Sequence, residues 1–249
     1  MILMQVVPSF VLIAPAYNEE LLLRTRVQEI SDGAKINFIK GLIIAQNGSR
    51  DLTSKIADEL SKKSDEMAIY AIHLPVGDYG NALAEGMKFG LTKFQKEDTW
   101  FLLTAMDLPF RMSDIASFMA LAPHKNSIVI GSKGHPHSVV KRSFQRTALS
   151  FGYLVLRRIF LGLPYKDTQG TIFLPLVLAE KVLPTIKSRG FFFTTELIFR
   201  LHQMNCDIKE VPVTLRVEER ESKVHWFRDG TRMLKYTARL YLEKIFKLK

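Results

Sequence analysis

In residues 9–20, with the sequence SFVLIAPAYNEE, side chains that could bind a ligand follow directly after an apolar segment. Phe10 to Ala14 lack polar alternation, which is typical of a strand buried on both faces of a parallel sheet. An aromatic ring at Tyr17 can stack on a base, and a carboxylate at Glu19 can accept hydrogen bonds from a ligand. Because ligands of open α/β sheets bind at the carboxyl ends of the strands, this segment predicts a binding edge. The same Asn-Glu-Glu turn could instead cap the following helix and complement its dipole.

Two later segments have side chains or backbone amides suited to a nucleotide. Gln46 and Asn47 end a second apolar segment, and their amides could hydrogen-bond the edge of a base or form a polar turn. Gly77, Gly80 and Asn81 precede a predicted helix, whose first backbone amides could approach a phosphate or a ribose. Each segment alone is also compatible with a turn that has only a structural role.

Basic residues collect in the second half of the chain. Residues 1–124 contain 12 Lys or Arg and 15 Asp or Glu, whereas residues 125–249 contain 23 and 10. This asymmetry indicates an anionic partner for the second half, such as a nucleic acid, an anionic membrane surface or a phosphorylated lipid. We expect no nucleic-acid partner, because the chain has no recognisable nucleic-acid-binding module and its basic half is strongly apolar.

A basic group follows the apolar segment 127–131. Its members are Lys133, Lys141, Arg142 and Arg146. Arg can pair bidentately with a phosphate and Lys supplies a point charge, so this group could hold phosphates. A solvated basic face of a helix is the alternative.

The apolar pattern predicts which elements position these residues. Strands are expected at 10–14, 39–45, 67–73, 100–105, 127–131, 170–174 and 208–217. Helices are expected at 18–31, 51–64, 79–93, 112–121, 143–161, 175–187, 194–204 and 229–247. The alternation in the first half predicts an α/β fold with a Rossmann-like, mostly parallel sheet flanked by helices. We expect one domain over residues 1–249, with a nucleotide-binding half up to residue 124 and an acceptor-binding half beyond it.

Two amphipathic segments could contact a membrane. Residues 143–163 and 232–249 combine large apolar side chains with Lys and Arg, as interfacial helices do, although either could pack on the core instead. The chain lacks both the charged start of a signal peptide and an 18-residue apolar run without charge. Its single cysteine, Cys206, excludes an intrachain disulfide. These features fit a reducing compartment, and a cytoplasmic protein that is peripheral on the membrane is what the resemblance described next implies.

The polar segments occur in the order of the motifs of family 2 glycosyltransferases, the nucleotide-sugar-dependent GT-A group, which the chain resembles over about residues 9–235. The matching segments are PAYNEE at 15–20, AQNGSRD at 45–51, GDYGNA at 77–82, TAMDLP at 104–109, GSK at 131–133, DTQG at 167–170, FFFTTE at 191–196, EVPV at 210–213 and ESKV at 221–224. The set is most similar to the polyprenyl-phosphate branch, which includes dolichyl-phosphate mannose synthase and dolichyl-phosphate glucosyltransferase. The resemblance implies a GT-A fold and inverting transfer of a hexose from a UDP- or GDP-linked sugar to a polyprenyl phosphate at the cytoplasmic membrane face.

The resemblance also implies which residues form the site. The nucleotide would be bound by Pro15, Ala16, Tyr17, Glu19, Gln46, Asn47, Gly80, Asn81 and Met106. The sugar and the acceptor would be bound by Asp167, Gln169, Glu196, Ser222 and Lys223. Catalysis would depend on Asp107, Lys133 and Arg142. Glu196, expected to be partly buried, could bind a sugar hydroxyl or organise basic residues.

Asp107 occupies the last position of the family's Asp-x-Asp motif, which reaches the divalent cation at the diphosphate. Oxygen ligands and substrate phosphates suit Mg²⁺ or Mn²⁺. The first Asp of the motif is replaced by Ala105, and Pro109 stands where the family frequently has Gln. Three possibilities follow: substrate phosphates hold the ion together with Asp107, basic residues replace the ion, or the chain no longer catalyses. Gln46 and Asn47 also replace the family's usual Asp residues, so the identity of the base cannot be carried over.

The implied acceptor determines the expected mechanism. A phosphate monoester has a second pKa of about 6, so its oxygen is already an anionic nucleophile at pH 7 and needs no strong general base. Catalysis would rest on positioning and on cations that hold two anionic groups together. A transferase of the same fold with a soluble acceptor and a nucleotide-sugar-binding protein without turnover are the alternatives.

Overall fold

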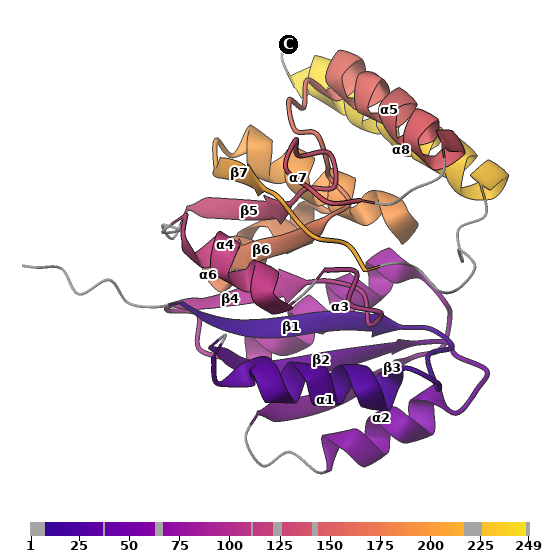
Figure 1. The fold of residues 1–249 in the computed structure, drawn as a ribbon. Coiled ribbons are helices and arrows are strands. Elements are labelled where there is room, and N and C mark those ends of the chain that lie inside the picture. The colour runs from indigo at the N-terminus through magenta and orange to yellow at the C-terminus, as the bar shows by residue number, and fades with distance from the viewer. Residues whose placement is uncertain are drawn as a thin grey trace, which may run out of the picture.

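One sheet of seven strands forms the centre of the fold (Figure 1). The computed structural model describes residues 8–36, 38–62, 67–110, 112–121, 126–140, 144–216 and 226–247. The strands are β1 (Ser9–Ala16), β2 (Ile39–Asn47), β3 (Ala68–Leu74), β4 (Thr99–Leu103), β5 (Ser127–Gly131), β6 (Thr171–Pro175) and β7 (Asp207–Val211). Their order across the sheet is β3-β2-β1-β4-β6-β5-β7, so strands from both halves of the chain share one sheet.

Most neighbouring strands run parallel. β1 pairs in parallel with β2 and β4, β2 with β3, and β5 with β7, whereas β6 is antiparallel to both β4 and β5. The predicted mostly parallel sheet flanked by helices is therefore confirmed. The direction of β6 was not predicted, because a strand buried on both faces has the same apolar composition in either direction.

Helices cover both faces of the sheet (Figure 1). The α-helices are α1 (Leu23–Ala34), α2 (Thr53–Ser61), α3 (Tyr79–Lys93), α4 (Ile115–Met119), α5 (Phe144–Leu156), α6 (Leu176–Val182), α7 (Phe193–Gln203) and α8 (Trp226–Lys247). Shorter turns are the 3₁₀ segments η1 (Met112–Asp114), η3 (Leu183–Thr185) and η4 (Gly190–Phe192) and the π-helical segment η2 (Arg157–Leu161).

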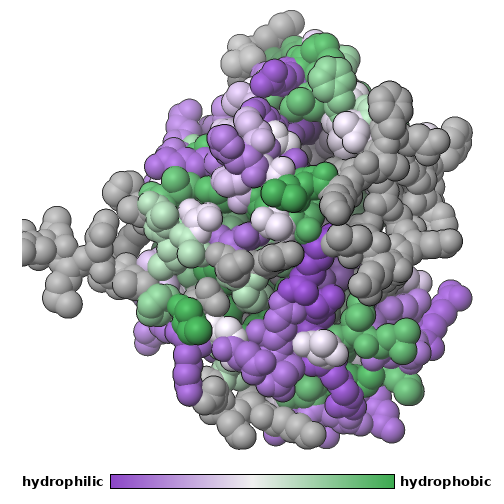
Figure 2. Space-filling view, in the orientation of Figure 1, coloured by the Kyte–Doolittle hydropathy of each residue, from purple (hydrophilic) through white to green (hydrophobic). Residues whose placement is uncertain are grey.

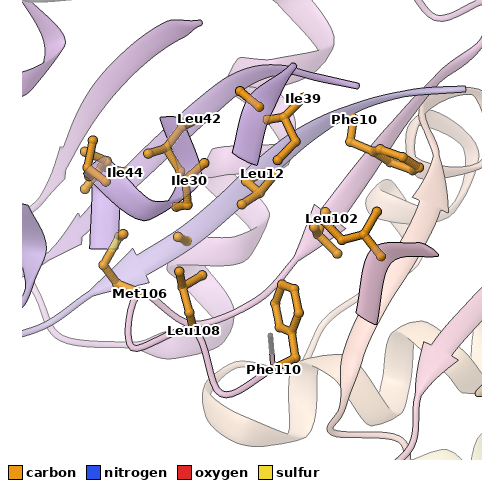
Figure 3. Close-up of a cluster of buried hydrophobic side chains, with 14 of the residues drawn as sticks. Phe10, Leu12, Ile30, Ile39, Leu42, Ile44, Leu102, Met106, Leu108 and Phe110 are labelled. Carbon is orange, nitrogen blue, oxygen red and sulfur yellow. The ribbon is translucent and has the colours of Figure 1, made fainter. Parts of the chain in front are cut away.

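The central strand β1 supplies side chains to two apolar layers. Phe10 and Leu12 belong to the layer that includes Ile30 of α1, which Figure 3 shows together with residues of β2 and β4. Val11 belongs to the opposite layer, which includes Leu83 of α3. Burial on both faces explains why β1 shows no polar alternation.

A third apolar cluster lies beneath α8. It contains Leu161, Leu163, Phe192, Phe199 and Leu240, all of which are buried. Phe160 and Tyr241 also meet edge to face, with their ring centroids 5.3 Å apart, so the end of the α5–η2 segment lies beside α8 (Figure 1). Both amphipathic segments therefore use one face to pack within the protein.

Two predicted boundaries near the first motif are wrong. The strand expected at 10–14 does not stop before Pro15, because β1 continues to Ala16. Proline has no backbone N–H to donate, but on this side of β1 the pairing with β4 ends at Ile13, so no acceptor is left without a donor. The carbonyl of Pro15 still accepts a hydrogen bond from Met106 N. The first helix begins at Leu23 and not at residue 18, because Asn18 has a left-handed backbone with φ of 51°.

Candidate functional site

The loops that follow β1 and β2 are joined by hydrogen bonds between backbone and side chains. Asn18 N donates to Ser49 Oγ (3.0 Å), and Arg50 N donates in return to Asn18 Oδ1 (2.9 Å). Glu19 N donates to Thr53 Oγ1 (2.7 Å). The polar residues after Tyr17 therefore connect the two loops, and Glu19, which is buried, contributes through its backbone here.

Asp51 holds the second of these loops in place. Its carboxylate accepts hydrogen bonds from Thr53 N (3.0 Å), Thr53 Oγ1 (2.5 Å) and Glu20 N (3.2 Å). Partial burial raises the pKa of Asp51, but the hydrogen bonds from Thr53 and Glu20 outweigh it and leave the pKa below its usual value. Asp51 thus connects the start of α2 to the loop after β1.

Tyr17 and Asn47 lie close to the loop that precedes α3. Asn47 Oδ1 accepts a hydrogen bond from Asp78 N (2.7 Å), so this carboxamide oxygen is engaged within the protein. The ring of Tyr17 lies against Gly77 and is 37% exposed, which suits stacking on a planar ligand. Gln46 is buried beside Asn47 at the end of β2.

The start of α3 has a structural role that the motif did not predict. Asp78 caps the helix, and its Oδ1 accepts hydrogen bonds from Asn81 N (2.8 Å) and from Gly190 N (2.9 Å). A Cβ on Gly80 would lie 2.5 Å from Phe193 Cβ, so only glycine fits there. Gly80 and the Asn81 amide thus serve packing and capping in this structure. An Asp directly before a predicted helix indicates a helix cap, so the capping role of Asp78 could have been predicted. Its hydrogen bond with Gly190 could not, because the two residues are far apart in the sequence.

Asp107 lies beyond the end of β4, near the beginning of α3. Burial, followed by the negative charge of Asp107, raises the pKa of the Tyr79 hydroxyl, which places the two residues near each other. The side chain of Met106 is buried in the apolar layer that contains Leu12 and Ile44 (Figure 3), and its backbone N donates to Pro15 O. Leu108, with φ of 46°, turns the chain back after Asp107.

Lys133 and Asp167 hold the loop before β6. Asp167 accepts hydrogen bonds from Lys133 N (3.0 Å) and Gln169 N (2.7 Å), and Lys133 Nζ lies 3.4 Å from its carboxylate. Burial raises the pKa of Asp167, but the charge of Lys133 and these hydrogen bonds outweigh it, so the pKa lies below its usual value. Lys133 Nζ also donates to Gln169 O (2.8 Å), and Gln169 Nε2 donates to Phe191 O (3.1 Å). The structure brings these predicted residues together, with mutual contacts that order the loop.

Glu196 is more deeply buried than predicted. Its side chain has no exposed surface, and its carboxylate accepts hydrogen bonds from Arg200 (2.9 Å), Arg239 (2.6 Å) and Ser188 N (2.7 Å). Burial raises the pKa of Glu196, but the hydrogen bonds from Ser188 and Arg200 and the charge of Arg239 leave it lowered. Of the two roles considered for Glu196, this geometry supports the organisation of basic residues.

Some predicted residues fall outside the part of the chain that the structure describes. They are Lys141, Arg142, Ser222 and Lys223, and the side chain of Arg146.

The residues near Asp107 offer few ligands for a divalent cation. Among the described residues, no group of three or more His, Cys, Asp or Glu side chains could hold a metal ion. Asp107 supplies one carboxylate, because Ala105 occupies the other position of the motif. One carboxylate fits an ion that takes its remaining ligands from substrate phosphates and water, as Mg²⁺ does in many nucleotide sites.

The chain is similar to several curated proteins. No family model matches it. It is 27% identical to the dolichyl-phosphate beta-glucosyltransferase of Dictyostelium discoideum over 95% of this chain and 76% of that protein. The proteins of the same name from Drosophila melanogaster and Homo sapiens are 26% and 23% identical, over 81% of this chain and 65% of each relative. The chain is related to these glycosyltransferases. The predicted resemblance is therefore confirmed, although the chain spans less than two thirds of the fly and human relatives.

Solved structures show the same fold. Glucosyl-3-phosphoglycerate synthase from Mycobacterium tuberculosis, in complex with Mn²⁺, UDP and glucosyl-3-phosphoglycerate, superposes with a TM-score of 0.63 at 17% identity, over 94% of this chain and 78% of that one. Its complex with UDP gives a TM-score of 0.61 at 16% identity, over 95% of this chain and 79% of that one. The chain therefore has the predicted GT-A fold.

Proposed function

We propose that the protein transfers a hexose, with inversion, from a nucleoside diphosphate sugar to a polyprenyl phosphate at the cytoplasmic face of a membrane. The observation that carries the proposal is the edge where Tyr17 follows β1, Asn47 ends β2 and Asp107 lies beyond the end of β4. This edge has an exposed ring for a base, ordered loops and a carboxylate for a metal-bound diphosphate. The similarity to dolichyl-phosphate beta-glucosyltransferases favours glucose as the hexose.

Asp107 would hold Mg²⁺ or Mn²⁺ together with the diphosphate of the donor. When bound, such an ion neutralises negative charge on the leaving nucleoside diphosphate. Asp107 orients the diphosphate from the end of β4, and Tyr79 beside it stays protonated because its pKa is raised. A protonated Tyr79 can donate a hydrogen bond to an anionic oxygen.

The acceptor phosphate would be held by the basic residues of the second half. Arg142 and Lys223 are proposed for this role from their positions in the matched motifs. Lys133 is partly neutralised by Asp167, so we assign it mainly to the order of the loop that faces the sugar. With the phosphate oxygen already anionic, the protein has to align the nucleophile and screen charge.

Peripheral membrane contact would be made by the surface of α5, η2 and α8, which we call the α5–α8 face. Its large exposed apolar side chains are Leu149, Phe151, Val155, Ile159, Phe160, Leu234, Leu242, Ile245 and Phe246. Residues 226–247 also contain six Lys or Arg and two Asp or Glu. Exposed apolar side chains with neighbouring cations suit an anionic lipid surface. None of the described helices is long and apolar enough to cross a bilayer.

A transfer assay tests the proposal. The purified chain is incubated with membrane lipid extract and a panel of radiolabelled UDP- and GDP-sugars, with UDP-glucose first. We expect label in the organic phase with one of the donors and no transfer to water-soluble acceptors. Transfer to a soluble acceptor alone would identify the rival transferase of the same fold.

A second candidate function is nucleotide-sugar binding without turnover. Ala105, Gln46 and Asn47 favour it, because each replaces an Asp that the family usually has. Binding of a nucleotide sugar with no product under any lipid condition would support this alternative and contradict the transferase.

A further inference from the structure

A compact network of four charged side chains joins α8 to α7. Glu196 of α7 accepts hydrogen bonds from Arg200 (2.9 Å) and from Arg239 of α8 (2.6 Å). Arg200 in turn donates through both terminal nitrogens to the carboxylate of Glu243 in α8 (2.7 and 2.8 Å). Two carboxylates and two guanidinium groups balance each other, which makes their burial tolerable. The network thus fixes the position of α8 along α7.

The same carboxylate holds the turn at 188–192. Ser188 N donates to Glu196 Oε2 (2.7 Å), the oxygen that also receives Arg239. The turn contacts α8 directly as well, because Phe192 stacks on Tyr236 with ring centroids 5.4 Å apart. Glu196 therefore links the position of α8 to the conformation of the turn at 188–192, because it accepts hydrogen bonds from both.

The turn at 188–192 ends at the proposed donor site. Gly190 N donates to Asp78 Oδ1 (2.9 Å), and Asp78 N donates to Asn47 Oδ1 (2.7 Å). Gly190 has a left-handed backbone with φ of 62°, so its amide direction depends on the conformation of this turn. A Cβ on Gly80 would lie 2.7 Å from Gly190 O, which shows how closely the turn approaches α3.

We propose that Arg239 and Glu196 are positioning residues that couple the seating of α8 to the donor edge. The route runs from Arg239 through Glu196 to Ser188 and Gly190, and from there to Asp78, the cap of α3. A change in the contact between α8 and Glu196 alters the turn and with it the hydrogen bonds around Asp78 and Asn47. The α5–α8 face, proposed above to contact lipid, includes α8, so a change in how α8 sits on lipid would reach the donor edge through Arg239 and Glu196.

The test compares two variants, each of which removes one positive charge from α8. Arg239→Gln removes the guanidinium of α8 that donates to Glu196, whereas Lys235→Gln removes an exposed charge elsewhere on α8. Hydrogen exchange is measured on the full chain over residues 77–83 and 186–192, which contain the Asn81 and Gly190 amides. We expect faster exchange in both segments for Arg239→Gln, with Lys235→Gln unchanged and Arg239→Lys largely restored. Exchange in β1 and β2 should stay as in the wild type, which excludes general unfolding.

Nucleotide affinity supplies the second measurement and rests on the proposed function. We expect Arg239→Gln to weaken UDP or GDP binding about threefold to tenfold, with Lys235→Gln close to the wild type. Equal exchange and equal affinity for the two Gln variants would overturn the coupling while leaving the proposed function intact. If the wild type binds neither nucleotide, the proposed function fails, and exchange at residues 77–83 alone decides the coupling.

Discussion

At the carboxyl edge of β1 and β2, loops are joined by polar hydrogen bonds, whereas on the α5–α8 face large apolar side chains point outward. The edge holds Asn18, Asp51 and Asn47 through contacts within the protein, so its geometry exists before any ligand binds. On the α5–α8 face, Ile159 is 69% exposed and Phe246 is 70% exposed. Figure 2 shows such hydrophobic residues next to hydrophilic ones at this end of the molecule. The proposed donor site is therefore ordered by contacts within the protein, whereas the proposed lipid-facing surface still has apolar area to bury.

The largest expected effect is the loss of transfer in Asp107→Ala. Asp107 is the one carboxylate left in the metal motif, and its removal should cost at least ~3 kcal/mol in the transition state, which is a rate loss of roughly a hundredfold. Initial rates of lipid-linked product measure this, and thermal denaturation checks that the fold is retained. Such a loss would show that the sugar is transferred at the edge of β1, β2 and β4 and not at the α5–α8 face.

A chelator sharpens the same prediction. We expect EDTA to abolish transfer and millimolar Mg²⁺ or Mn²⁺ to restore it, because one carboxylate binds the ion weakly. If EDTA and Asp107→Ala both leave the rate unchanged, the metal interpretation is wrong, and the basic residues become the candidates for stabilising the leaving group. If only EDTA is harmless, Asp107 acts on the sugar or the ribose.

A smaller effect is expected for vesicle binding when the α5–α8 face is made acidic. Changing Ile159 and Phe246 to Asp removes two exposed apolar side chains and adds negative charge, which should weaken binding to anionic vesicles on the order of tenfold. Flotation over a range of salt concentrations measures this, since electrostatic attraction is screened by salt. Changing Ile36 and Leu52 to Asp, at two exposed positions outside that face, is the matched control. Equal flotation of the two double variants would show that lipid does not bind here.

A still smaller effect is expected for Asp78→Ala. The variant loses the cap of α3 and the acceptor for Gly190, which should lower the free energy of unfolding by about 1–2 kcal/mol. Asp78→Asn keeps an acceptor oxygen and should recover most of the loss. Chemical denaturation measures both variants. An unchanged Asp78→Ala would mean that the edge is ordered by the loops after β1 and β2 alone.

The smallest effect concerns acid stability. The pKa of Asp167 is lower in the folded state than in the unfolded state, so its contribution is complete above the unfolded pKa and is lost as the pH falls through the folded value. We expect the wild type to lose stability below about pH 4. Asp167→Asn should be less stable at pH 7 and should show a shallower decline below about pH 4. Parallel curves for the two proteins would contradict this assignment.

The elements near β1 could be predicted because burial leaves a local pattern. The apolar run at 10–14 and the following polar turn predicted a strand and a binding edge, and both the sheet and the GT-A fold are confirmed. The end of β1 was misplaced because proline lacks a backbone N–H. At Pro15 this does not matter, because β4 has already ended and no strand there would accept a hydrogen bond from it. Local sequence cannot show where a neighbouring strand ends.

Contacts between distant residues could not be predicted in the same way. Glu196 and Arg200 are four residues apart on a helix, so their pairing was readable from the sequence. The partnership of Glu196 with Arg239 spans 43 residues and depends on how α8 packs over α7. The bond between Asp78 and Gly190 spans 112 residues. Motif order therefore predicted the candidate site, whereas the contacts between its residues required the structure.

The central claim is tested most directly with defined acceptors in vesicles. Transfer from labelled UDP-glucose is measured with a polyprenyl phosphate, with the corresponding polyprenol and with 3-phosphoglycerate. We expect a lipid-linked product only with the polyprenyl phosphate, because the anionic phosphate oxygen is the nucleophile, and an inverted anomeric configuration in that product. Equal transfer to the polyprenol, or transfer to 3-phosphoglycerate alone, would contradict it.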